Sequence, residues 1–309
     1  MEHVTYPKIP VTRQAAGAHV GGPWVATEKL HGAQLVVGFD GRQVRVGKRR
    51  EWLAPGESFF GWQLLRGNLE SVARLALGDG VSVRVYGELY GGAYPHPDVP
   101  AVPGMSPVQT GIWYHPAVRF AVFDVLRCVA PDDPGVFRPY SELVPLAEAA
   151  GVDVVPLLGR GTRRELDRLP TRFPTGMPRR LGLPELAGNA AEGLVLRPDT
   201  PAGPERPIVK RKIEEFDEAR FGEAVPADPR RFVPAAQLTE VAAPMLNAAR
   251  LASARSKLGA VSEELLVQEM VLDVLVDLAD ALPVAVSALT PGEHGALAER
   301  LLERARGLI

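Results

Sequence analysis

The stretch TEKLHG at residues 27–32 is the part of this 309-residue chain on which the fold assignment depends. It continues an apolar run from Trp24 that has the length of a short strand, and its glycine indicates a tight turn after that strand. Lys29 therefore stands at a strand end, where Gly32 lets a phosphate approach the backbone closely. A lysine amine is nucleophilic only when unprotonated, and burial or a neighbouring cation lowers its pKa toward that state. By itself, K-x-H-G also fits a surface lysine before a turn.

Five further motifs follow Lys29 and supply groups that handle a nucleoside triphosphate. They are GKRRE (47–51), VYGELYGG (85–92), FAVFDV (120–125), AEGLVLRP (191–198) and IVKRK (208–212). Glu88 and Glu192 lie beside glycines at strand ends, and Lys210 and Lys212 alternate on one strand, so the two lysines share a face. In such a site cations neutralise phosphate charge, carboxylates hold ribose hydroxyls or a divalent metal, and an aromatic ring stacks on the base.

In these ordered motifs the chain resembles the covalent nucleotidyltransferases, and within them the RNA ligase 2-like enzymes of phages, kinetoplastid RNA editing and bacteria. The resemblance spans about residues 24–221 and includes GESFFGW (56–62) and EEFDE (214–218). DNA ligases and capping enzymes usually carry K-x-D-G, whereas the histidine here favours the RNA ligase 2 branch. The resemblance implies an ATP-dependent ligase that joins 3′-hydroxyl and 5′-phosphate ends through lysyl-AMP and RNA-adenylate intermediates. It implies nicked or paired RNA as substrate and Mg²⁺ or Mn²⁺ as the metal.

The resemblance also implies a role for each site residue. The residues that it implies as catalytic are Lys29, His31, Glu88, Glu192, Lys210 and Lys212. Those that it implies for nucleotide binding are Glu28, Lys29, Arg49, Glu88, Phe123, Lys210 and Lys212, and the implied metal ligand is Glu192. Lys29 attacks the α-phosphate, and Phe123 covers the adenine, with Phe120 as its neighbour one face-repeat away on the strand. Arg49 contacts the ribose, and Arg50 is the competing choice for that role.

Local patterns predict an α+β fold, with an antiparallel-rich nucleotidyltransferase (ATP-grasp-like ligase) domain at residues 1–225. Short strands are predicted at 24–30, 33–40, 42–49, 81–90, 118–126, 193–198 and 207–212. Asp40-Gly41 indicates a two-residue hairpin turn. A helix is predicted over 61–77, with its apolar face formed by Leu64, Leu65, Leu69, Val72 and Leu75. A second is predicted over 141–151, with Ser141 as N-cap and Gly151 as its stop.

Residues 226–309 are predicted to form a small all-α C-terminal domain. The Pro- and Ala-rich stretch 224–236 has the composition of a linker. Beyond it the pattern is helical, with a bend or restart near Pro244 and a helix opening at Ser262. A last helix begins at Thr290, where Pro291 and Glu293 complete a capping box. The tail carries 8 Lys and Arg against 11 Asp and Glu, which argues against broad phosphate binding by the tail alone.

Composition is that of an ordinary soluble protein, with 46% hydrophobic and 23% charged residues. One cysteine excludes a disulfide framework, and the chain has neither an export signal nor an apolar run of membrane-spanning length, so we expect a cytoplasmic protein without membrane contact. No protein partner is evident. The net charge of −2 leaves room for a local basic groove. Two alternatives stay open: a ligase of DNA or mixed RNA–DNA nicks, and a degenerate nucleotidyltransferase that only binds nucleic acid.

Overall fold

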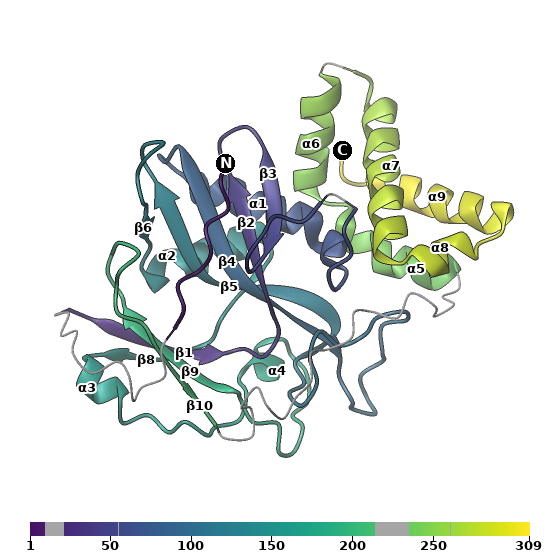
Figure 1. Ribbon diagram of the computed structural model, residues 1–309. Coiled ribbons are helices and arrows are strands. Elements are labelled where there is room, and N and C mark those ends of the chain that lie inside the picture. Colours follow the sequence, from purple (N-terminus) through teal and green to yellow (C-terminus); the bar gives the residue numbers. More distant parts are fainter. Residues whose placement is uncertain (10–21, 55, 214–234, 260) are drawn as a thin grey trace.

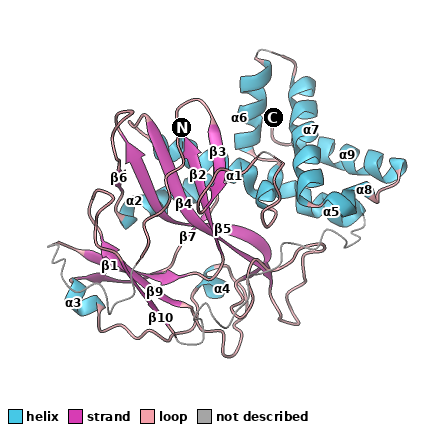
Figure 2. Ribbon diagram, viewed as in Figure 1, coloured by secondary structure: helices cyan, strands magenta, loops and turns pink. Residues whose placement is uncertain are grey.

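The computed structural model describes residues 1–9, 22–54, 56–213, 235–259 and 261–309 (Figure 1). Two β-sheets with flanking helices form the first part of the chain, and a group of helices lies beside it (Figure 2). The α+β fold with a helical C-terminal region confirms the predicted fold class. The predicted boundary at residues 225 and 226, most of the linker at 224–236 and the motif at 214–218 lie outside the described residues.

The smaller sheet carries both ends of the motif series. Its four strands are antiparallel in the order β10 (Val209–Lys212), β9 (Gly193–Pro198), β1 (Trp24–Lys29) and β8 (Leu157–Gly161). In this register Lys29 of β1 and Lys212 of β10 both lie opposite Gly193 of β9. The end of β1, the start of β9 and the end of β10 therefore meet at one edge of the sheet.

The larger sheet supplies the opposite wall of the site. Its main path runs β3 (Val44–Lys48), β2 (Ala33–Phe39), β4 (Ser82–Ala93), β5 (His115–Cys128) and β6 (Val136–Phe137), and β7 (Asp153–Val154) pairs with β5. The long predicted strands are confirmed, whereas β6, β7 and β8 were not predicted, because strands this short or exposed lack a periodic apolar pattern. The hairpin between β2 and β3 is also confirmed.

The loop of that hairpin is longer than predicted. Phe39 pairs with Val44, so four residues connect the strands instead of two. The carboxylate of Asp40 accepts hydrogen bonds from the backbone N–H groups of Arg42 and Gln43. This local side-chain bonding stabilises a wider turn than the Asp-Gly pair alone indicates.

Helices α1 (Arg66–Leu77) and α2 (Tyr140–Ala150) cover the larger sheet, and a 3₁₀ helix, η2 (Trp62–Leu65), precedes α1. The prediction that Leu75 belongs to the buried face is wrong, because Leu75 is 49% exposed. Ser141 is not the N-cap of α2, because the helix already begins at Tyr140 and its N-cap is Pro139. Gly151 does end α2, in the left-handed conformation that glycine adopts at little cost. The short helices α3 (Arg163–Leu166) and α4 (Met177–Arg180) were not predicted.

The tail is helical in its described part. It contains α5 (Ala235–Ala242), η4 (Ala243–Met245), α6 (Ala248–Leu258), α7 (Glu263–Ala281), α8 (Pro283–Ser287) and α9 (Pro291–Arg306). The predicted restart near Pro244 is confirmed, since η4 separates α5 from α6. The N-caps at Ser262 and Thr290 are also confirmed, the latter with its complete capping box.

The tail packs against the first part of the chain through η2 and α1. Trp62, Leu64 and Leu69 belong to the same buried apolar cluster as Met245 and Val274 of the tail. At this junction the carboxylate of Asp277 accepts hydrogen bonds from Arg66 at 2.7 Å and from Arg250 at 2.7 Å. Apolar burial and a shared buried carboxylate therefore join the tail to η2 and α1. No helix among the described residues is long and apolar enough to cross a membrane.

Candidate active site

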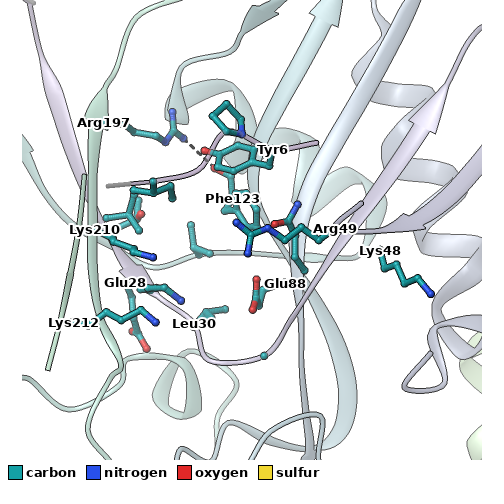
Figure 3. A pocket seen from close by; sticks show the side chains of 18 of the residues that line it. Tyr6, Glu28, Leu30, Lys48, Arg49, Glu88, Phe123, Arg197, Lys210 and Lys212 are labelled. Carbon is teal, nitrogen blue, oxygen red and sulfur yellow. Dashed lines mark hydrogen bonds between the residues drawn. The ribbon is translucent and has the colours of Figure 1, made fainter. Parts of the chain in front are cut away.

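A cavity of about 660 Å³ is enclosed by the two sheets and the N-terminal segment (Figure 3). Seven of the nine predicted site residues line it: Glu28, Lys29, Arg49, Glu88, Phe123, Lys210 and Lys212. The other two, His31 and Glu192, lie directly beside it through their contacts with Lys29 and Lys212. The structure thus brings together residues in or directly beside β1, β3, β4, β5, β9 and β10 that are scattered along the sequence.

Glu192 is the centre of a charged cluster at one end of the cavity. Its carboxylate accepts a hydrogen bond from Lys29 Nζ at 2.7 Å and forms an ion pair with Lys212 Nζ at 2.9 Å. Nδ1 of His31 lies 3.5 Å from the same carboxylate. The strand register explains this meeting, because Glu192 directly precedes the residue that pairs with both lysines. One buried carboxylate, 2% exposed, therefore binds the predicted nucleophile and one of the two predicted phosphate-binding lysines.

The two carboxylates nearest Lys29 have opposite electrostatic environments. Burial disfavours ionisation of Glu192, but the charges of Lys29 and Lys212 and the hydrogen bond to His31 outweigh it and hold its pKa well below the usual range. Burial raises the pKa of Glu88 to about 7, and the positive charge of Lys29 opposes this rise. Glu192 is thus a fixed anion at neutral pH, whereas Glu88 titrates near neutrality.

Glu28 uses its carboxylate to hold a neighbouring loop. The hydroxyl of Thr175 donates a hydrogen bond to the carboxylate of Glu28, and the backbone N–H of Gly176 donates to the same carboxylate at 2.9 Å. Burial raises the pKa of Glu28 to about 7, against the effect of these two hydrogen bonds. Glu28 borders the cavity, but its carboxylate already accepts hydrogen bonds from Thr175 and Gly176.

Phe123 reaches the cavity from β5, at the position of a β-bulge. Tyr86 of β4 pairs with Asp124 and Gly87 pairs with Val122, so Phe123 is the extra residue. Successive side chains of a strand alternate between its two faces, so Phe120 and Phe123, three positions apart, point to opposite faces. Phe123 lines the cavity, whereas Phe120 is 2% exposed in the core. The interpretation of Phe120 as a neighbour on the same face is therefore wrong.

The end of the cavity near Phe123 contains residues that the sequence did not indicate. The ring of Tyr6 packs edge-on against Phe123, with 5.0 Å between centroids, and the Tyr6 hydroxyl donates to Asp124 at 2.7 Å. Arg197 lines the cavity and donates to the carbonyl of Phe123 at 3.3 Å. Arg206 forms an ion pair with Asp124. Tyr6 carried no sequence signal, whereas a charged residue in the apolar strand GLVLRP was a signal for Arg197.

The wall formed by β3 is basic and partly exposed. Arg49 and Arg50 both line the cavity and both are exposed, so the geometry leaves their competition for the ribose contact open. Lys48 also lines the cavity, and its amine binds Glu57 at 2.9 Å. Phe59, from the quoted stretch 56–62, reaches the same wall. Three consecutive cations at the end of one strand make this wall attractive to phosphate groups.

The donor set suits a divalent metal held partly by substrate. No group of three or more His, Cys, Asp or Glu side chains with metal-binding geometry occurs in the part of the chain that the structure describes. Mg²⁺ commonly binds through one or two carboxylates while water and substrate phosphates supply its other ligands. Glu192, an ionised carboxylate beside the cavity, fits that mode, whereas a metal site built from protein ligands alone does not.

The chain belongs to the RNA ligase family, because the model of that family matches residues 22–212, well over half of the chain. RNA-editing ligase 2 of Trypanosoma brucei brucei is 30% identical over 228 residues, which cover 63% of this chain and 54% of that protein. RNA-editing ligase 1 from the same organism is 30% identical over 208 residues, covering 56% of this chain and 44% of that protein. The chain thus spans about half the length of these relatives.

Among solved structures, the chain is similar to the E312A mutant of Naegleria gruberi RNA ligase with AMP and Mn. The TM-score is 0.47 at 14% identity, over 70% of this chain and 58% of that one.

Proposed function

We propose that this chain is an ATP-dependent RNA ligase that joins 3′-hydroxyl and 5′-phosphate ends through a covalent lysyl-AMP on Lys29 and an RNA-adenylate. The observation that carries the proposal is the position of Lys29. Its amine lies at one end of a cavity large enough for a nucleotide, next to Glu192 and Lys212. An aromatic ring, Phe123, lines the same cavity beside Arg197.

In the first step the unprotonated amine of Lys29 attacks the α-phosphorus of ATP. A nitrogen–phosphorus bond forms, the bond from the α-phosphorus to the oxygen of the β-phosphate breaks, and pyrophosphate leaves as the amine loses a proton. Lys29 has to exchange Glu192 for the α-phosphate in this step. Lys210 and Lys212 line the path of the phosphates and offset their negative charge.

In the second step an oxygen of the RNA 5′-phosphate attacks the AMP phosphorus, and the bond to Lys29 breaks as the lysine nitrogen takes up a proton and leaves as the amine. In the third step the 3′-hydroxyl attacks the 5′-phosphate, loses its proton, and AMP leaves. Glu192 would hold Mg²⁺ or Mn²⁺, which supplies charge neutralisation at the phosphates. His31 contacts Glu192, a position consistent with its expected function after lysine adenylylation.

The choice of ATP as the nucleotide rests on the resemblance of the ordered motifs to those of ATP-dependent ligases, because the buried Arg197 already donates to the backbone carbonyls of Phe123 and Arg138. The trypanosome relatives carry RNA-editing ligase in their names, which favours RNA over DNA ends. Nicked or paired RNA is the substrate that the motif K-x-H-G favours.

Incubation of the full chain with α-labelled ATP and Mg²⁺ tests the first step. We expect a stable protein–AMP adduct and release of pyrophosphate, with much weaker label transfer from GTP. A chain that binds ATP without forming the adduct is a nucleotide-binding module instead. Sealing assays on nicked RNA, nicked DNA, mixed nicks and single-stranded RNA then test the substrate, and equal sealing of nicked DNA contradicts the RNA assignment.

A further inference from the structure

The turn that follows the proposed nucleophile is short and tightly packed. Leu30, His31 and Gly32 connect β1 of one sheet to β2 of the other. A Cβ atom added to Gly32 would lie 1.9 Å from the carbonyl oxygen of Leu89, so the turn backbone lies directly against β4. The side chains on either side of Leu30, those of Lys29 and His31, both reach Glu192. A small shift of this turn therefore moves two groups of the site together.

Two side chains lie against successive backbone N–H groups of this turn. Glu88 packs directly against Gly32, and the backbone N–H of Gly32 lowers the pKa of its carboxylate. The N–H of His31 donates to the hydroxyl oxygen of Tyr114 at 2.9 Å. Tyr114 is 1% exposed and does not line the nucleotide cavity. Its oxygen thus binds the backbone of the turn from the protein interior.

Tyr114 is itself held by contacts that connect it to the segment of Glu192. Asn189 forms two side-chain hydrogen bonds with the backbone of Trp113, the residue before Tyr114. It accepts from the Trp113 N–H at 2.9 Å and donates to the Trp113 carbonyl at 2.7 Å. Asn189 stands three residues before Glu192 in the chain. The ring of Tyr90 packs edge-on against Tyr114, with 5.4 Å between centroids. Through Trp113 and Tyr114, these hydrogen bonds connect the chain segment next to Glu192 to the turn next to Lys29.

The surroundings of Tyr114 keep its phenol neutral. Burial, together with the charge of Glu28, raises the pKa of Tyr114 well above its usual value, and the charges of Glu192 and Glu88 act in the same direction. A neutral phenol in this position acts through its hydrogen bond and not by exchanging a proton.

We propose that Tyr114 is a positioning residue that fixes the Lys29–Gly32 turn, so that the amine of Lys29 meets the α-phosphate and His31 stays at Glu192. The proposal rests on the function proposed above. Without the phenol oxygen the buried N–H of His31 loses its partner, which favours a rearranged turn. Misplacement of reacting groups by about 1 Å can cost about 100-fold in rate.

Tyr114→Phe tests the proposal, and Tyr90→Phe is its matched control. Both variants remove one hydroxyl from a buried tyrosine of the same aromatic pair, but the hydroxyl of Tyr90 donates to Asp153 at 2.7 Å and not to the turn. We expect Tyr114→Phe to slow lysyl-AMP formation about 10- to 100-fold at saturating ATP. Its KM for ATP should stay near the wild-type value. Tyr90→Phe should lower the Tm yet retain the wild-type rate.

Hydrogen exchange of the peptide that contains the His31 amide gives a second measurement, independent of activity. We expect faster exchange in Tyr114→Phe than in wild type or Tyr90→Phe. A wild-type rate in Tyr114→Phe, or equal slowing in both variants, overturns the proposal. If wild type forms no adduct, the proposed function fails, and amide exchange alone decides whether Tyr114 holds the turn. If Tyr114→Phe does not fold, Asn189→Ala replaces it, and wild-type rate and exchange in that variant overturn the proposal.

Discussion

Lys29 Nζ and Glu192 Oε2 lie 2.7 Å apart, although 163 residues separate them in the chain. In this arrangement the proposed nucleophile is bound to the carboxylate that we propose as the metal ligand. An amine bound to a carboxylate is not free to attack phosphorus. In the proposed mechanism, binding of metal and ATP therefore has to release Lys29 from Glu192, which would couple substrate binding to activation of the nucleophile.

Lys29→Ala should abolish formation of the protein–AMP adduct, a loss of at least about 1,000-fold, because no other amine replaces a covalent nucleophile. Transfer of label from α-labelled ATP to the protein measures this directly. Lys257→Ala is a suitable control, since Lys257 binds Asp273 and Glu269 in the tail and should leave adduct formation unchanged. A persistent adduct in Lys29→Ala would show that a different residue is the nucleophile.

Glu192→Gln should slow adduct formation by about 100- to 1,000-fold, because a neutral amide neither holds a divalent metal well nor attracts Lys212. Single-turnover rates across a range of Mg²⁺ concentrations check this. We also expect a weaker apparent affinity for Mg²⁺. An unchanged dependence on Mg²⁺ contradicts the metal-binding role of Glu192 while leaving that of Lys29 intact.

Glu28→Gln should change how stability depends on pH. The pKa of Glu28 is about 7 in the fold against 4.5 for an ordinary glutamate, so the folded state keeps a proton that the unfolded state releases. Stability from this group therefore falls as pH rises from about 4.5 to 7, by on the order of 3 kcal/mol. Glutamine does not ionise, so the free energy of unfolding of the variant should rise relative to that of wild type between pH 5 and pH 8. Denaturant unfolding of both proteins at both pH values measures this difference. An equal change of the unfolding free energy with pH in wild type and variant contradicts the prediction.

Phe123→Leu should raise the KM for ATP about tenfold in adduct formation, because the loss of an aromatic contact to a base costs about 1–2 kcal/mol. Phe120→Leu is the matched control on the same strand. Phe120 packs in the core next to Gly87, so its substitution should lower the Tm without changing the KM. Equal effects of both substitutions on KM would contradict a direct contact between Phe123 and the base.

Asp277→Ala should loosen the junction between the tail and α1. This change leaves Arg66 and Arg250 without the buried carboxylate that binds both, which is expected to cost about 3–5 kcal/mol of stability. We predict that sealing of nicked RNA falls more than adduct formation, because all six motifs lie outside the tail. Sealing and adduct assays below the unfolding temperature compare the two steps. A parallel loss in both assays argues that the tail supports the nucleotide site itself.

Much of the local structure followed from the sequence. Alternating apolar residues and capping residues act within a few positions, so the long strands and the helix starts at Ser262 and Thr290 were predictable. The order of six motifs was sufficient to nominate nine site residues, all of which lie in or beside one cavity. Local patterns misplaced Leu75 and Ser141, because burial and helix starts there depend on what packs against them.

Only the tertiary structure decided which of these groups interact. The pairing of Lys29 and Lys212 with Glu192 arises from strand register, which no local pattern encodes. Tyr6 enters the site from a distant segment, where its ring packs against Phe123. The pKa values near 7 of Glu28 and Glu88 arise from burial. The sequence thus determined the chemistry available to this protein, and the packing of two sheets decided its geometry and electrostatics, because both depend on contacts between residues far apart in the chain.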